Sequence, residues 1–243
     1  PIKIKNGLSR SEKIFLIGHD SDSFNRWEAA QEISTDIILS VVDNINEGRE
    51  PKVDTKYVEA MRLVLNDKSL DRAFTAEMLS LPSESVVGQQ KLPSDVDGIH
   101  LARKSVIKTL ALAFRADLLK TYNECKTREP YQYNPKEVGS RRLKNVALGY
   151  LMEIADEDII KLCSDQLSSA GNMTDEIASF TLLVNSEAEC REESIEKFYT
   201  KWKHDPLVID KWFGAQALSN RDDVFDQMDI LNNHPDFDFK TPN

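Results

Sequence analysis

Side chains that could bind a metal are few in this sequence, and they are widely spaced. The four histidines are His19, His100, His204 and His234. None stands at a metal-ligand spacing from another histidine or from a cysteine, and no His-Glu-x-x-His motif occurs. An unpaired histidine is ordinarily a packing, loop or surface residue, and we expect this for all four. The sequence therefore predicts no metal-binding residue in this chain.

Acidic side chains gather in three clusters, at residues 156–158, 187–193 and 222–226. Each cluster falls at the expected start of a helix or on an exposed helix face. Carboxylates near a helix N-terminus interact favourably with the helix dipole, and this explains the clusters better than general acid and base catalysis does. We therefore assign no catalytic residue to them.

Motifs that bind nucleotides or activate a nucleophile are missing from the sequence. It contains no Gly-x-Gly-x-x-Gly and no Gly-Lys-Ser/Thr segment, so nucleotide phosphates have no recognisable cradle and no cofactor-binding residue is predicted. Gly-x-Ser-x-Gly is absent as well. Folding could still bring a serine or cysteine beside a histidine, so a free-standing hydrolase with a spatially assembled triad stays open as an alternative.

The charge balance of the chain argues against nucleic acid as a partner. The 243 residues carry a formal net charge of -10, which would repel a phosphate backbone. The densest basic group is Arg141, Arg142 and Lys144. It lies within a helical pattern, and we expect it to be a solvated helix face.

The number of cysteines and the hydropathy of the chain bear on its cellular location. Cys125, Cys163 and Cys190 are odd in number and far apart, which does not suggest a disulfide framework and favours a reducing, cytoplasmic location. No run approaches the roughly 20 apolar residues that cross a bilayer, so we expect no membrane partner. The chain begins at Pro1 with a polar, basic segment, and we expect it to be cut from a longer polypeptide.

The first predicted element differs from all the others. Residues Glu12 to His19 form a short apolar run closed by a glycine and a histidine, which has the length and composition of a buried strand. From about Asp22 onward the periodic segments are helical. A lone strand needs a sheet, and we expect that sheet to lie outside this chain.

The remaining segments combine apolar stripes with helix-capping residues. The first stripe runs from Trp27 to Ile45 and ends at Gly48. Further helix starts are expected at Asp54, Ser69, Ser83, Asn134 with Pro135, Asp156, Thr174 and Asp205 with Pro206, and further stripes at 99–118, 195–202 and 224–231. About ten helices joined by short loops predict an all-α fold, an irregular antiparallel helical solenoid with a short N-terminal β-strand remnant.

Five segments of the sequence match a known family in the same order along the chain. They are Asp20–Gln31 (DSDSFNRWEAAQ), Leu81–Glu84 (LPSE), Asn172–Asp175 (NMTD), Asp205–Phe213 (DPLVIDKWF) and His234–Asn243 (HPDFDFKTPN). Each resembles a segment of the bacterial alanyl aminopeptidases of the aminopeptidase N type. The short segments are weakly specific alone, but the two long ones in register with the rest make the resemblance strong over essentially the whole chain.

The resemblance implies a division into domains. Residues 1–20 would be the remnant of a preceding β-sandwich domain, and residues 21–243 would be the C-terminal helical domain, incomplete at its C-terminus. In this family the zinc motif, the third zinc-binding glutamate, the Gly-x-Met-Glu-Asn segment and the catalytic tyrosine all lie upstream and have no counterpart here. Zinc would therefore belong to the parent enzyme, and the catalytic and β-sandwich domains of the same polypeptide would be the partners of this chain.

Two functions from different classes follow from these observations. In the first, the chain is a non-catalytic helical domain that covers the active site of a zinc-dependent aminopeptidase. It would restrict access to peptide substrates, from which the enzyme removes N-terminal amino acids. In the alternative, the chain is a helical-repeat scaffold with no enzymatic parent, and it binds a protein along a concave face.

Overall fold

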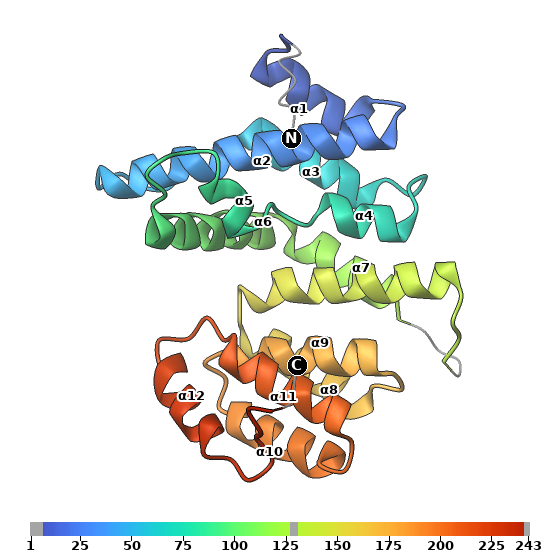
Figure 1. The fold of residues 1–243 in the computed structure, drawn as a ribbon. Helices are drawn as coiled ribbons and strands as arrows, with labels where there is room; N and C mark the ends of the chain where they lie inside the picture. Colours follow the sequence, from blue (N-terminus) through green and yellow to red (C-terminus); the bar gives the residue numbers. More distant parts are fainter. Residues whose placement is uncertain (1–6, 127–130, 241–243) are drawn as a thin grey trace. The chain divides into compact units, whose positions relative to one another are not determined.

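The computed structural model describes residues 7–126 and 131–240, and this part of the chain forms twelve α-helices and no strand (Figure 1). The predicted all-α class is confirmed, with two helices more than the ten expected. The helices are α1 (Arg10–His19), α2 (Ser23–Asn46), α3 (Thr55–Asn66), α4 (Arg72–Met78), α5 (Glu84–Gly88), α6 (Val96–Glu124), α7 (Pro135–Met152), α8 (Glu157–Ser169), α9 (Met173–Val184), α10 (Arg191–Trp202), α11 (Pro206–Ala217) and α12 (Val224–Asn232).

The helices belong to two compact units. Unit 1 comprises residues 1–127 and 133–153 and holds α1 to α7, while unit 2 comprises residues 128–132 and 154–243 and holds α8 to α12. Within each unit, many helices that follow one another in the chain pack together, as α1 does with α2, α6 with α7, and α8 with α9. Packing between sequence neighbours is what the predicted helical solenoid requires.

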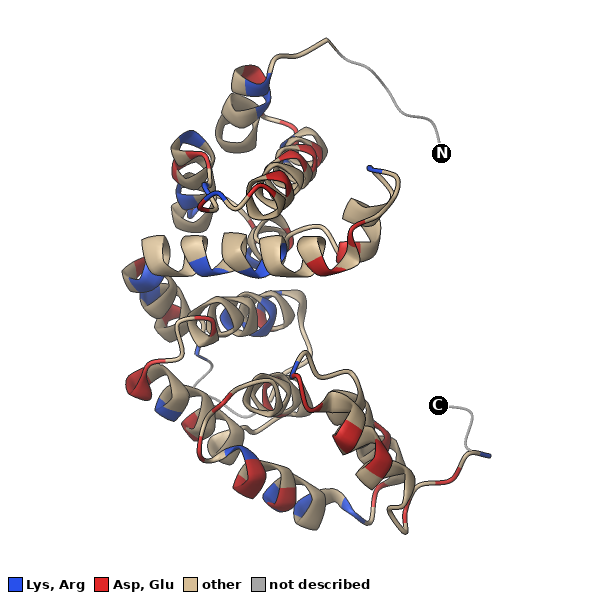
Figure 2. Cartoon of the chain, turned by 90° about the vertical axis from the view of Figure 1, so that its left-hand side faces the viewer, with Lys and Arg blue, Asp and Glu red and all other residues tan. Residues whose placement is uncertain are grey.

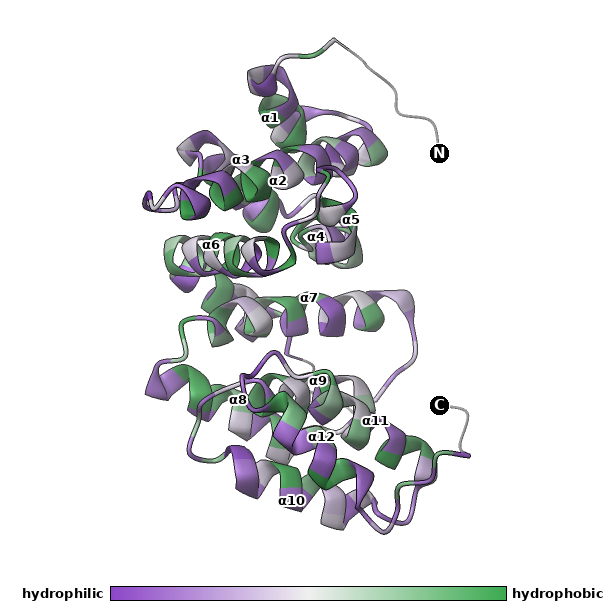
Figure 3. Cartoon of the chain, turned by 60° about the vertical axis from the view of Figure 1, so that its left-hand side comes forward, coloured by the Kyte–Doolittle hydropathy of each residue, from purple (hydrophilic) through white to green (hydrophobic). Residues whose placement is uncertain are grey.

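The core of unit 1 is built from the apolar stripes of its two longest helices. On α2, Ile33, Ile37 and Val41 are buried at a spacing of four residues. On α6, Val106 and Leu110 are buried in the same way, and α2 packs against α6. Hydrophobic and hydrophilic segments accordingly alternate around these helices in Figure 3. Amphipathic periodicity therefore determines which face of each helix is enclosed.

Unit 2 has a separate, aromatic core. The rings of Phe180 on α9 and Phe198 on α10 stack with their centroids 4.2 Å apart. Trp212 on α11 is buried beside them, and its indole nitrogen donates a hydrogen bond to the carbonyl oxygen of Ile195 at 3.1 Å. Large flat side chains bury much area for each residue fixed, which suits a unit of only five helices.

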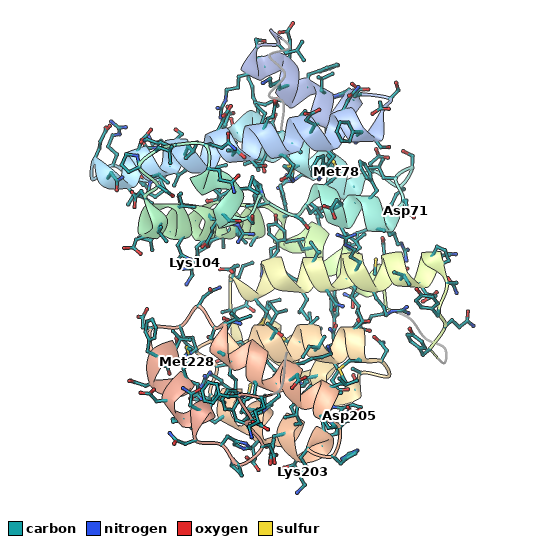
Figure 4. The ribbon with its side chains drawn as sticks, in the orientation of Figure 1. Asp71, Met78, Lys104, Lys203, Asp205 and Met228 are labelled. Atoms are coloured by element: carbon teal, nitrogen blue, oxygen red, sulfur yellow. The ribbon has the colours of Figure 1, made fainter. Side chains whose placement is uncertain are left out.

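Side-chain caps begin most of the helices where the sequence predicts them. Asp54, Ser83, Asn134, Asp156 and Asp205 each accept a hydrogen bond from a backbone N–H in the first turn of the helix that follows. Figure 4 labels Asp205 at the start of α11. These contacts satisfy donors that have no partner inside the helix.

The cap predicted at Ser69 is wrong. Helix α4 begins at Arg72, and Asp71, labelled in Figure 4, accepts hydrogen bonds from the backbone of Ala73 and Phe74 at 2.8 and 3.2 Å. The Ser69 hydroxyl donates instead to the Asp67 carboxylate at 2.5 Å. An aspartate two residues further on competes for the same role, and it stands immediately before the first helical residue.

The strand predicted over Glu12 to His19 is also wrong, because these residues form helix α1. Ser9 and Glu12 form a capping box in which Glu12 N donates to Ser9 Oγ at 3.3 Å and Ser9 N donates to Glu12 Oε2 at 2.8 Å. Ile14 and Ile17 are buried three residues apart against α2 and α3. The predicted β-sandwich remnant rested on this strand; residues 1–6 lie outside the described residues.

The predicted solvated basic face is wrong for two of its three residues. Arg141 and Lys144 are buried, with 3% and 6% of their surface exposed. Helix α7 packs against both α4 and α6, so its long side chains lie along other helices rather than in water. Only Arg142 follows the prediction, since it is half exposed and pairs with Glu77.

Candidate functional site

Two of the four histidines are engaged with neighbours on their own or an adjacent helix in unit 1. The His19 ring stacks on the Phe15 ring with centroids 4.2 Å apart, and its Nδ1 lies 3.0 Å from the Phe15 carbonyl oxygen. His100 Nδ1 lies 2.9 Å from Glu84 Oε1, which joins α6 to α5. Both contacts are local pairings on partly exposed surface rather than the ligand set of a metal.

The other two histidines lie in unit 2. His234 packs against Tyr199 and Trp212 with ring centroids 5.0 and 5.2 Å away, and its Nδ1 accepts a hydrogen bond from Asp236 N at 3.2 Å. His204 is exposed at the end of α10. Among the described residues, no serine or cysteine lies within hydrogen-bond distance of any histidine, so the spatially assembled triad has no supporting geometry.

The cysteines are free thiols, and Cys125 and Cys163 are buried. Burial raises the pKa of Cys163 to about 12, and it raises the pKa of the buried Cys125 thiol as well. The thiolate is the nucleophilic form of cysteine, so both environments oppose activation. Cys190, which precedes α10, is partly exposed.

The acidic clusters lie at helix N-termini, as expected. Asp156 caps α8 and Glu157 lies in its first turn, while Glu192 and Glu193 occupy the first turn of α10. Figure 2 shows acidic and basic residues interspersed along the helices of both units. Within residues 7–126 and 131–240, no group of three or more histidine, cysteine, aspartate or glutamate side chains could hold a metal ion.

One hollow of about 260 Å³ lies between α1 and α2. Charged side chains line it, among them Lys13, Glu28 and Glu32, and Lys13 Nζ pairs with Glu32 Oε2 at 2.8 Å. Its lining contains no serine, cysteine or histidine that could act as a nucleophile or base. The hollow is therefore a surface recess between neighbouring helices, and it offers no chemistry of its own.

One buried carboxylate has a structural role that its position at a predicted helix start does not indicate. Glu176 on α9 is 4% exposed, and its Oε1 accepts from Lys201 Nζ at 2.7 Å and from Trp202 Nε1 at 2.8 Å. In the sequence Glu176 looks like an ordinary acidic residue in the first turn of a helix. Its two hydrogen-bond donors are 25 and 26 residues further along the chain, so no local pattern reveals them. Its contacts join α9 to α10 rather than forming a reactive centre.

The family of this chain follows from a match that covers nearly all of it. A family model described as a domain of unknown function with ARM repeats, DUF3458_C, matches residues 10–243. The chain belongs to this family. The match begins at the first residue of α1, so α1 lies within the family domain rather than before it.

Curated relatives extend the comparison to whole enzymes. The chain is 31% identical over 245 residues to aminopeptidase N of Escherichia coli K12, 29% over 247 residues to that of Caulobacter vibrioides, and 28% over 243 residues to that of Haemophilus influenzae. In each case the match covers all of this chain and 28% of the relative. The chain thus spans little more than a quarter of the length of these relatives.

A solved structure shows the same arrangement. Legionella pneumophila aminopeptidase A, crystallised in complex with aspartic acid, matches 96% of this chain with a TM-score of 0.82 and 25% sequence identity. The match again covers 28% of that chain. Together these comparisons confirm the resemblance seen in the sequence, and the chain is homologous to the C-terminal helical domain of aminopeptidase N type enzymes.

Proposed function

We propose that this chain is the non-catalytic C-terminal helical domain of a zinc-dependent aminopeptidase that removes N-terminal amino acids from peptides. The observation that supports this most directly is the continuous match to three aminopeptidase N sequences over the whole chain. The catalytic and β-sandwich domains of the same polypeptide would be its partners, consistent with the 28% of each relative that it spans.

In this proposal the zinc belongs to another part of the polypeptide. The described residues present no group of ligands that fits it, and the buried thiols are held in their protonated form. A bound zinc ion would supply Lewis-acid chemistry at the peptide carbonyl and its attacking water. In this proposal the described residues supply no catalytic, cofactor-binding or metal-binding group.

Its role would be to cover the active site and restrict access to it. Each of the two units has an apolar core of its own, so each can hold a stable surface toward the rest of the enzyme. The location would be cytoplasmic, in keeping with three free cysteines. None of the described helices is long and apolar enough to span a membrane.

The test compares the full-length enzyme with the isolated chain. The full-length protein should hydrolyse an alanyl chromogenic substrate and lose that activity to a chelator, whereas the isolated chain should neither turn it over nor retain stoichiometric zinc. Full-length protein that lacks chelator-sensitive turnover would contradict the enzymatic parent. Turnover by the isolated chain would contradict its non-catalytic role.

The alternative, a helical-repeat scaffold without an enzymatic parent, is favoured by the description of the family as ARM repeats. A pull-down with the tagged chain separates the two functions. Recovery of the catalytic part, or restored turnover on mixing with it, supports the aminopeptidase domain. Stoichiometric recovery of unrelated proteins alone supports the scaffold.

A further inference from the structure

Helix α1 is apolar on more sides than unit 1 covers. Its central run is Ile14, Phe15, Leu16 and Ile17, four consecutive apolar residues that together point around most of the helix. Ile14 and Ile17 are 7% and 0% exposed against α2 and α3, whereas Phe15 is 60% exposed. The polar residues of α1 lie in its first turn and at His19, so its central turn places an exposed aromatic ring outside the side that α2 and α3 cover.

The exposed side of α1 continues onto α3. A Cβ atom on Gly18 would lie 3.3 Å from Leu63 Cδ1, so the Leu63 side chain rests directly on the α1 backbone. Leu63 is itself 52% exposed, and the His19 ring stacks flat on Phe15 with 2° between the planes. Phe15, Gly18, His19 and Leu63 thus form one surface, which we name the α1–α3 face.

The position of this face in the chain indicates what covers it. Helix α1 is the first element of the family domain, whose match begins at residue 10, and Figure 1 shows it at one end of unit 1. The chain is homologous to the C-terminal domain of enzymes of which it spans 28%, and in the proposed function the domains of the remaining length precede α1. A domain joined directly to the N-terminal end of α1 has a high effective concentration at this face.

We infer that the α1–α3 face is the docking surface for the domain that precedes this one in the same polypeptide. The inference rests on the proposed function for the existence of that domain. The partner surface would be apolar and shaped to receive the Phe15 ring and the Leu63 side chain. Continuity of the chain favours this occupant over a second copy of the protein, because an intramolecular contact forms at any concentration.

Hydroxyl-radical footprinting of the full-length protein tests the docking surface. Phe15 and Leu63 should be modified several-fold more slowly in the native protein than after unfolding in urea, a larger reduction than their 60% and 52% exposure in this chain would give. Native modification rates close to the unfolded rates would overturn the inference. Protection that disappears on dilution would also overturn it, because a second copy would then be the occupant.

Two variants of the full-length protein sharpen the result. Phe15→Asp should restore rapid modification of Leu63, because a carboxylate on the α1–α3 face opposes dehydration. Phe24→Asp is the matched control, since Phe24 is 61% exposed on α2 outside this face, and it should leave Leu63 protected. Equal effects of both variants would count against the inference, and the wild-type footprint decides it if Phe15→Asp does not fold.

The footprint is independent of catalysis. It is measured without substrate, so a full-length protein that lacks aminopeptidase turnover still reports whether the α1–α3 face is covered. Failure of the proposed function and failure of this inference therefore give different results.

Discussion

Glu176 illustrates how unit 2 accommodates a carboxylate in its interior. The side chain is almost fully enclosed, and a buried charge is tolerated only when it is paired and hydrogen-bonded. Lys201 supplies the opposite charge and Trp202 supplies a neutral donor, both from the last turn of α10. The contrast is Trp27 on α2, whose buried Nε1 finds no acceptor among the described residues.

These two tryptophans predict unequal effects of the same substitution. Trp202→Phe removes a donor from a buried carboxylate and should destabilise the folded chain by about 1–3 kcal/mol. Trp27→Phe removes a donor that has no partner among the described residues, so it should cost clearly less. Both side chains are partly exposed, which makes the pair a matched comparison. Urea unfolding of the two variants and the wild type measures the difference.

The outcome that contradicts this account is a Trp27→Phe variant destabilised as much as Trp202→Phe. That result would show that Trp27 Nε1 has an acceptor in solution, such as an ordered water or a neighbouring domain. A Trp202→Phe variant of unchanged stability would show that Lys201 alone satisfies Glu176.

Residue types in the sequence limit which chemistry this chain could perform, but they do not show which side chains are buried. The scarcity of histidine and cysteine patterns was readable from the sequence, because metal ligands and nucleophiles need particular residue types. The sequence does not predict which charged residues are buried. Arg141 and Lys144 lie on α7 between α4 and α6, and that burial depends on helices about 20 to 70 residues away in sequence.

At the scale of elements, periodicity and caps predicted nearly every helix and failed at α1. An amphipathic helix is recognised in a sequence when apolar residues recur every three or four positions over several turns, as they do in the 24 residues of α2. The four apolar residues of α1 span about one turn and show no polar side, so their pattern suits a buried strand equally well. The capping box of Ser9 and Glu12 was the local signal that could have separated the two.

The cap of α1 provides a direct test of that assignment. Ser9→Ala removes the acceptor for Glu12 N and should destabilise α1 by about 0.5–2 kcal/mol. Ser9→Thr is the control, because threonine keeps the hydroxyl that accepts from Glu12 N and donates to the Glu12 carboxylate, and it should keep most of the stability. Hydrogen exchange of the amides of residues 12–18 reports α1 without requiring the whole chain to unfold.

The two alternatives for this segment differ clearly in that measurement. A capped helix predicts faster exchange in Ser9→Ala and nearly wild-type exchange in Ser9→Thr. A strand whose donors pair with another sheet would respond equally weakly to both substitutions, and that result would contradict the helical assignment of residues 10–19.

At the scale of the whole molecule, the chain is two compact units with separate apolar cores. Unit 1 is centred on aliphatic side chains of α2 and α6, and unit 2 on the rings of Phe180, Phe198 and Trp212. The sequence predicted one helical domain because the stripes continue without a change of composition. The division depends on which helices pack together, and helical periodicity carries no such long-range information.

Residue patterns indicate the function of this chain less directly than they indicate its fold. No group of described side chains could hold a metal ion, and the resemblance to the family rests on segments such as Asp205–Phe213 rather than on a site. In the structure this segment begins with the cap and first turn of α11 and contains the buried Trp212. The residues of this segment build the fold, so the resemblance that they carry indicates the domain and no catalytic group.

The two units predict that a core substitution acts mainly within its own unit. Phe180→Ala in unit 2 and Leu110→Ala in unit 1 each replace a side chain with 0% exposure, and each should cost about 2–5 kcal/mol through lost burial and a cavity. Because each core is enclosed by its own helices, amides of α8 to α12 should lose hydrogen-exchange protection in the first variant and amides of α1 to α7 in the second. Each variant is the control for the other. Equal loss of protection in all helices in either variant would show that the chain unfolds as one cooperative body. The two units would then differ in their packing but not in their stability.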